Sequence, residues 1–126
     1  MIKHSNFASR WLEVKDDIIA GLQQIHANET VVNGVFTKQV EEKLKQVSKR
    51  KYAVLCRSGS EAITMSLLAH GIQPGDKVVI PNYSCVAVLS SVMVAGCQPV
   101  FCEVNQYGSL DADQLQSFTN HNIKAV

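Results

Sequence analysis

Short apolar runs alternate with segments of helical period over the second half of the sequence, and this alternation limits the possible folds most strongly. The runs predict strands at residues 52–56, 77–81 and 98–104, and the start of a fourth at 124–126. Between them, apolar residues recur every three or four positions, which predicts helices at residues 60–70 and 84–95 and a short helix capped by Asp111. Strands that alternate with helices favour crossover connections and therefore a mostly parallel sheet in an α/β fold.

The first third of the chain predicts two helices, each with one apolar face. Apolar side chains recur at steps of three and four in the first, with Ser5 or Asn6 as its N-cap: Phe7, Trp11, Val14, Ile18, Leu22 and Ile25. The second is predicted at residues 37–48. Asn33 and Gly34 lie between them and predict a turn.

Composition and charge exclude several classes of protein. Hydrophobic residues make up 46% of the chain and charged residues 18%, which is typical of a globular protein. The formal net charge of +1 gives no overall field that would attract nucleic acid or an anionic membrane. The most apolar stretch, residues 84–97, is shorter than the roughly 20 residues of a membrane span, so we expect a buried helix there.

The cysteines and histidines do not form a recognisable metal or nucleophile motif. The four cysteines contain no CxxC pair, and no histidine lies at zinc-finger spacing from them. The N-terminal residues lack the apolar core of a signal peptide. Reduced thiols and the missing signal predict a cytoplasmic protein with no metal site.

The sequence Ser58-Gly59-Ser60-Glu61 stands where a predicted strand gives way to a predicted helix. Glycine allows a tight turn and close approach of a ligand. We expect the amides of Ser60 and Glu61 to be the first of the helix, without intrahelical acceptors, and such amides bind phosphate well. The simpler interpretation is that Ser58 or Ser60 only caps the helix, and the four residues alone do not decide between the two.

Longer strings in fixed order resemble the DegT/DnrJ/StrS-type sugar aminotransferases, which belong to the fold type I enzymes that use pyridoxal phosphate (PLP). The resemblance runs from about Val31 to the end of the chain. Its parts are Ser58-Gly59-Ser60 before Ala62-Ile63, Gly71-Ile72 with Pro74-Gly75-Asp76, Val78 with Ile80-Pro81, Ala95-Gly96 with Pro99-Val100-Phe101 and Val104, and Asp111 to Leu115 before Lys124-Ala125-Val126. It implies an N-terminal helical segment at residues 1–30 and part of a large PLP-binding domain at residues 31–126.

The resemblance also implies which residues form the site. Gly59, Ser60 and Glu61 match the segment that holds the PLP phosphate, with Glu61 where the family usually has alanine. Cys85 matches the position of an aromatic ring over the cofactor. Asn33 and Gly34 match a loop near the substrate. The partners that it implies are a nucleotide-linked keto-sugar, an amino-acid donor such as glutamate and a second copy of the chain in a homodimer.

The family's Schiff-base lysine and the aspartate that pairs with the pyridinium nitrogen lie beyond the stretch that matches Val126. The sheet also stops within a predicted strand, so we expect a fold that is incomplete at its C-terminus. This chain alone is therefore expected not to transfer amino groups. The alternatives are a truncated or split-gene remnant that only binds phosphate or a partner, and a small flavodoxin-like ligand binder. Amination and dehydration of the sugar are not distinguished.

Overall fold

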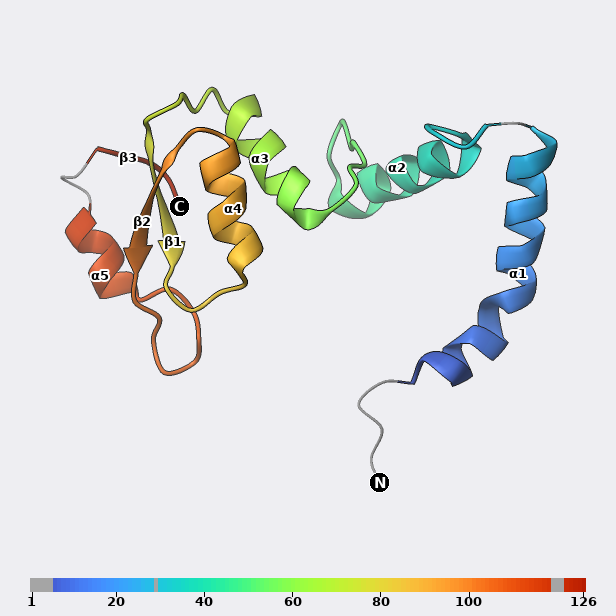
Figure 1. Ribbon diagram of the computed structural model, residues 1–126, viewed down its shortest axis with the longest axis horizontal. Coiled ribbons are helices and arrows are strands. Elements are labelled where there is room, and N and C mark those ends of the chain that lie inside the picture. Colours follow the sequence, from blue (N-terminus) through green and yellow to red (C-terminus); the bar gives the residue numbers. More distant parts are fainter. Residues whose placement is uncertain (1–5, 29, 119–121) are drawn as a thin grey trace. The chain divides into compact units, whose positions relative to one another are not determined.

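The computed structural model describes residues 6–28, 30–118 and 122–126, and the chain separates into two compact units (Figure 1). The first unit is Met1–Leu55 and the second is Cys56–Val126. Each unit is described by itself. The predicted boundary between residues 30 and 31 separates domains of the family and is a different boundary from the one between these units. It stays a prediction.

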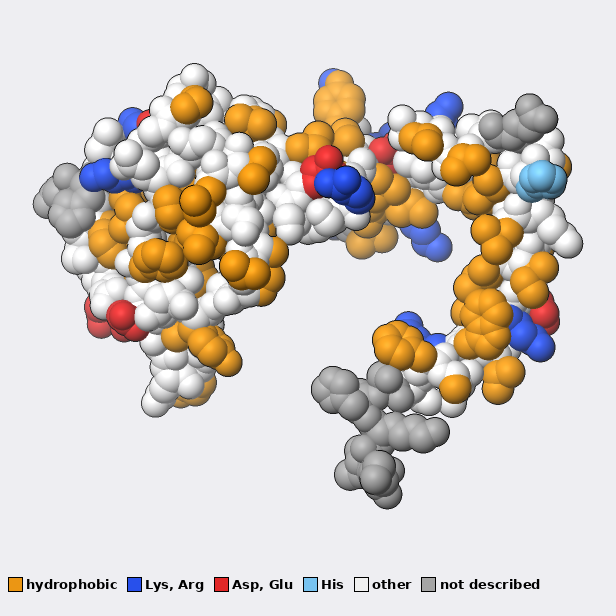
Figure 2. Space-filling view, viewed as in Figure 1, with side chains coloured by type: hydrophobic (Ala, Val, Ile, Leu, Met, Phe, Trp, Pro, Cys, Tyr) orange, Lys and Arg blue, Asp and Glu red, His pale blue; other side chains and the backbone are white. Residues whose placement is uncertain are grey.

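The first unit contains the two predicted helices, α1 at Phe7–Ala27 and α2 at Val35–Ser48. Both were predicted, although α2 begins two residues earlier than expected. Asn6 occupies the N-cap position of α1, but its side chain makes no capping hydrogen bond, and Ser5 lies outside the described residues. Neither helix buries a residue, so its apolar face remains at the surface, as the hydrophobic side chains along α1 show (Figure 2).

The strand predicted at residues 52–56 is not formed, and this prediction was wrong. A strand needs a neighbour to accept its backbone hydrogen bonds, and no described segment pairs with these residues. The side chains of Tyr52 and Val54 are 73% and 72% exposed. The amide of Leu55 instead donates to the Glu41 carboxylate at 2.9 Å.

The second unit is built on a parallel sheet, as predicted, with the strand order β2-β1-β3. The central strand β1 spans Lys77–Pro81, and its neighbours are β2 at Gln98–Cys102 and β3 at Ile123–Ala125. The strand predicted to reach residue 104 therefore ends at residue 102. Val104 instead forms an isolated antiparallel bridge with Leu110.

Helices cover both faces of this sheet. Successive side chains of a strand point to opposite faces, and the side chains of Val78 and Ile80 pack with Val92 of α4 (Val86–Val94). Val79 instead lines a small cavity together with Leu115 of α5 (Ala112–Ser117). Figure 1 shows α4 and α5 on either side of the strands. The apolar runs of the sequence are thus explained by burial from two sides.

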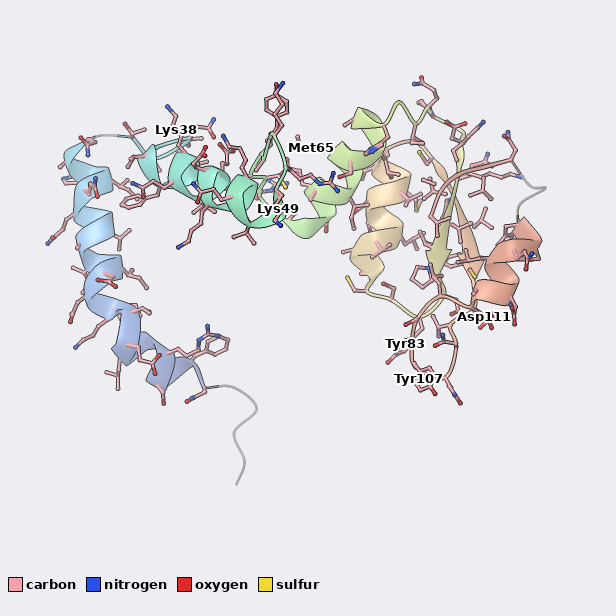
Figure 3. All side chains as sticks on the ribbon, turned by 180° about the vertical axis from the view of Figure 1, so that it is seen from behind. Lys38, Lys49, Met65, Tyr83, Tyr107 and Asp111 are labelled. Carbon is pink, nitrogen blue, oxygen red and sulfur yellow. The ribbon has the colours of Figure 1, made fainter. Side chains whose placement is uncertain are left out.

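The remaining helices begin at capping side chains. Asp111 caps α5 as predicted, because its Oδ1 accepts hydrogen bonds from the amides of Asp113 at 2.9 Å and Gln114 at 3.3 Å (Figure 3). Helix α3 spans Gly59–Ala69, one residue earlier at each end than predicted.

Helix α4 is buried on one face only, so the prediction of a buried helix was correct only in part. Ser91 and Val92 are its buried residues, whereas Val86, Met93 and Val94 are exposed. Within the described part of the chain, no helix combines the length and the apolar character that crossing a bilayer requires.

Val92→Ala is expected to lower the free energy of unfolding by about 2 kcal/mol, because the side chain is 1% exposed and its removal leaves a cavity beside β1. Val94→Ala is the matched control on the same helix, with a side chain 76% exposed and an expected change below about 0.5 kcal/mol. Urea unfolding followed by circular dichroism measures both. Equal losses for the two variants would contradict the described packing of α4.

Candidate functional site

The start of α3 is held by its own first turn. Ser58 occupies the N-cap with an extended backbone, and its Oγ accepts a hydrogen bond from the amide of Glu61 at 3.3 Å. Its carbonyl oxygen accepts the amide of Ala62 at 3.0 Å, the first bond of the helix. The capping role of Ser58 is therefore confirmed. Whether the same turn also binds phosphate stays a prediction.

The Glu61 side chain closes the turn from the other direction. Its Oε2 accepts a hydrogen bond from the amide of Arg57 at 2.7 Å. Ser58 and Glu61 thus form a reciprocal arrangement of the capping-box kind, with the carboxylate bonded to the amide just before the N-cap. A carboxylate in the first turn is also favoured by the helix dipole. The segment from Arg57 to Glu61 is consequently fixed at both of its ends.

The amides left for an anion are those of Gly59 and Ser60, since the Glu61 amide already bonds to Ser58. Gly59 does not have a positive φ, so a tight turn is not the reason for glycine here. A Cβ added at Gly59 would meet no atom within 4 Å. The space beside this backbone is therefore open to a ligand.

A cavity of about 340 Å³ adjoins this turn. Arg57, Ser58, Ser60 and Glu61 line it from the start of α3. Its other lining residues come from further along α3 and from α4: Thr64, Met65, Ser90, Ser91 and Val94. Five residues with hydroxyl groups thus line one space together with Arg57 and Glu61. The hydroxyls of Thr64, Ser90 and Ser91 already donate to backbone carbonyl oxygens. Hydroxyl and guanidinium groups are hydrogen-bond donors suited to phosphate oxygens.

A shared hydrogen bond joins α3 to α4 beside the cavity. The Thr64 hydroxyl lies 3.2 Å from the carbonyl oxygen of Ser60 and 3.1 Å from that of Ser91, and donates between them. Thr64 is six residues after the N-cap of α3, and Ser91 is six residues after the N-cap of α4. Because the two helices run in the same general direction in Figure 1, their N-termini lie at the same end of the unit.

Cys85 is the N-cap of α4, where its sulfur accepts a hydrogen bond from the amide of Ala87 at 3.3 Å. The thiol is exposed and is not among the residues that line the cavity. The structure therefore places Cys85 at the start of α4, outside the cavity that Ser60 lines. Its predicted position over a cofactor ring stays a prediction.

Asn33 and Gly34 belong to the first unit, at the entry to α2. Asn33 has a left-handed backbone with φ of 53°, and Gly34 is the N-cap of α2. A Cβ on Gly34 would approach the carbonyl oxygen of Thr30 to 3.1 Å. This close approach explains the glycine locally. The predicted role of the two residues as a substrate loop remains untested.

Several residues of the cavity were not predicted from the sequence. Arg57 was not singled out, and Thr64 and Ser90 were not predicted to face Ser60. The sequence contains one indication of a polar site on α4, because two adjacent serines interrupt this otherwise apolar helix. Ser91 is buried and donates to the carbonyl oxygen of Ala87 at 2.6 Å, while Ser90 is exposed and donates to the carbonyl oxygen of Val86 at 3.0 Å.

The fold and the site together define a class of protein. It is an α/β domain with a parallel sheet and with a helix, α3, whose first amides are suited to an anion. The sequence model of the DegT/DnrJ/EryC1/StrS aminotransferase family matches residues 13–126. The chain therefore belongs to this family.

Individual proteins are similar to this chain in sequence or in fold. The chain is 27% identical to the UDP-2-acetamido-2-deoxy-3-oxo-D-glucuronate aminotransferase of Pseudomonas aeruginosa, over all of this chain and 35% of that protein. A DegT DnrJ EryC1 StrS aminotransferase from Brucella abortus matches with a TM-score of 0.86 at 20% identity, covering 99% of this chain and 35% of that one. The Bacillus subtilis protein ntda, solved with bound cofactor PMP, matches with a TM-score of 0.83 at 27% identity, covering 89% of this chain and 26% of that one. The chain spans about a third of the length of the curated relatives it matches first.

Ser58→Ala is expected to lower the free energy of unfolding by about 1 kcal/mol, since it removes the oxygen that accepts the Glu61 amide. Ser58→Asp keeps an acceptor at the N-cap and is expected to stay close to the wild type. Chemical denaturation compares the three proteins. An alanine variant as stable as the aspartate variant would show that this cap does not support α3.

Cys85→Ser is expected to raise the free energy of unfolding by up to about 1 kcal/mol, because sulfur is a weak acceptor and serine is a strong N-cap residue. Cys85→Ala should not raise it, as it leaves the Ala87 amide without this partner. The neighbouring Ser84→Ala serves as the control. If serine at position 85 brings no gain over alanine in thermal unfolding, the capping role of Cys85 is refuted.

Proposed function

We propose that this chain is the N-terminal portion of a PLP-dependent aminotransferase that acts on a nucleotide-linked keto-sugar, and that the start of α3 holds the cofactor phosphate. The observation that carries the proposal is the family match over residues 13–126, which includes the self-capped turn from Arg57 to Glu61.

The donor set at the start of α3 fits the phosphate end of PLP. The amides of Gly59 and Ser60 begin the helix, and the open space at Gly59 lets an anion approach them. The hydroxyls of Ser58 and Ser60 and the guanidinium of Arg57 line the adjoining cavity. The bound PMP in the similar Bacillus subtilis protein supports the same cofactor for the complete form of this protein.

The substrate class rests on the relatives. The Pseudomonas aeruginosa protein is named for a UDP-linked 3-oxo sugar acid. We infer a nucleotide-linked keto-sugar as acceptor and an amino acid such as glutamate as donor for the complete enzyme.

The chain's own residues would bind and orient the cofactor. PLP supplies an electron sink when bound. Gly59 and Ser60 would anchor its phosphate, and Glu61 would hold their turn. Cys85 would pack its polarisable sulfur against the ring, as thioether and thiol sulfurs do with aromatic groups. Asn33 and Gly34 would border the substrate.

The proposal also covers the domain boundary, the oligomeric state and the cellular location of the protein. The family domain would begin at residue 31, after the N-terminal helical segment. The complete enzyme would be a homodimer, for which the exposed apolar face of α1 offers contact area. The free state of all four cysteines supports a cytoplasmic location.

No lysine is among the described residues that line the cavity beside α3. The cavity therefore offers no side-chain amine that could form a Schiff base with the aldehyde of the cofactor. We therefore propose that residues 1–126 alone do not transfer amino groups. A phosphate-binding module without catalysis is the second candidate, and the absence of a lysine from the described lining of this cavity favours it.

The test starts from the coding sequence that follows codon 126. If the frame, or an adjacent one, supplies a lysine-bearing remainder, the complete protein should convert a nucleotide-linked keto-sugar and glutamate into the amino sugar and 2-oxoglutarate, detected by mass spectrometry. In that protein, Ser60→Ala should weaken PLP retention by about 1–3 kcal/mol, the scale of one hydrogen bond to a charged group.

Ser66→Ala, the same substitution on the same helix but outside this cavity, is the control and should retain PLP normally. If the Ser60→Ala variant retained PLP as well as the wild type does, Ser60 would contribute only to the structure of the helix. A coding sequence without any lysine-bearing remainder would leave only the phosphate-binding module.

A further inference from the structure

We propose that Glu61 is a positioning residue for phosphate: its hydrogen bond to Arg57 holds the anion-binding amides in place, while its negative charge lowers the affinity of the same site. This inference rests on the proposed function, because it concerns the phosphate that α3 would hold. It assigns to one side chain two opposite effects that different substitutions can separate.

The positioning effect follows from the two hydrogen bonds across the turn. The Glu61 carboxylate accepts the amide of Arg57 at 2.7 Å, and the Glu61 amide donates to Ser58 at 3.3 Å. The segment between them contains Gly59, which is the most freely rotating residue type and has no neighbour within 4 Å of an added Cβ. Without the closure at Arg57, this segment would have to be ordered by the ligand, and that ordering would reduce the affinity.

The charge effect follows from where the carboxylate is held. Its oxygen lies at the amide just before the N-cap, and both Glu61 and Ser60 line the same cavity. In the absence of an anion, the carboxylate is stabilised by the positive end of the helix dipole. A phosphate at the same helix end carries the same sign of charge, so the two repel each other. Arg57 lines the cavity as well and provides the opposite charge.

A purely structural role for Glu61 predicts a different result. In that case, changes at Glu61 would alter the stability of α3, and the affinity for phosphate would simply follow the loss of structure. Under the proposal, removing only the charge increases the affinity, and removing the hydrogen bond as well cancels part of that increase. Glu61→Gln keeps an oxygen that can accept the Arg57 amide, whereas Glu61→Ala does not.

The experiment uses the 126-residue chain labelled with ¹⁵N, with inorganic phosphate as the probe. Titration of the Gly59 and Ser60 amide signals gives the dissociation constant, and hydrogen exchange at the Arg57 amide reports the closure of the turn without any ligand. The variants are Glu61→Gln and Glu61→Ala. Asp113→Asn is the control, because it removes one carboxylate from the first turn of another helix, α5.

We expect Glu61→Gln to bind phosphate about fivefold more tightly than the wild type, the scale of one like charge nearby in a water-like medium. Glu61→Ala should bind more weakly than Glu61→Gln and lose protection of the Arg57 amide, which the glutamine variant keeps. Asp113→Asn should bind like the wild type.

Two results would overturn the inference while leaving the proposed function intact: an alanine variant that binds at least as tightly as the glutamine variant, or a glutamine variant no tighter than the wild type. If no form shifts the Gly59 and Ser60 signals, the phosphate site of the proposed function itself is refuted, and the inference falls with it. In that case, a protected Arg57 amide would show that the turn is closed but does not bind phosphate. An unprotected Arg57 amide would show that the turn never closes.

Discussion

The burial of β1 is the constraint on which the second unit depends. Three consecutive side chains, Val78, Val79 and Ile80, are each less than 5% exposed. A strand whose consecutive side chains are all buried must be covered on both faces and paired along both edges. Helices α4 and α5 provide the cover, and β2 and β3 provide the pairing. The helices and strands that touch β1 are therefore placed by their relation to one five-residue strand.

The candidate site follows from this placement. In a parallel sheet with crossover helices, the helix that follows a strand runs back along it, so the helix starts lie near the carboxyl ends of the strands. Helix α4 is anchored by Val92 against β1, and the Thr64 hydroxyl joins α3 to α4 through Ser91. The amides of Gly59 and Ser60 are thus positioned by a chain of contacts that begins in the core. The geometry of the candidate site is thus a consequence of hydrophobic packing.

Sequence patterns predicted the parts of this unit whose causes are local. The period of α3 and the aspartate cap of α5 are set by residues close to one another in the chain, and both were predicted. The strand at residues 52–56 was not formed, because the apolar character of a segment shows that it can pair but not that a neighbour is present. The residues that face Ser60 across the cavity depend on how α3 packs on α4, and no local pattern contains that information. The capping role of Ser58 was foreseen, but the bond from Arg57 to Glu61 was not.

The two helix starts differ in a way that capping alone does not explain. Ser58 caps α3 with an oxygen, the acceptor that helix N-termini favour, whereas Cys85 caps α4 with a sulfur, which is a weaker acceptor. A serine at position 85 would make the stronger cap without adding volume that the exposed site could not hold. The proposed function would give the thiol a second role, because a polarisable sulfur suits contact with a cofactor ring. Under the proposed function, both helix starts would serve the same ligand, with α3 binding the phosphate through its amides and α4 contacting the ring through its cap.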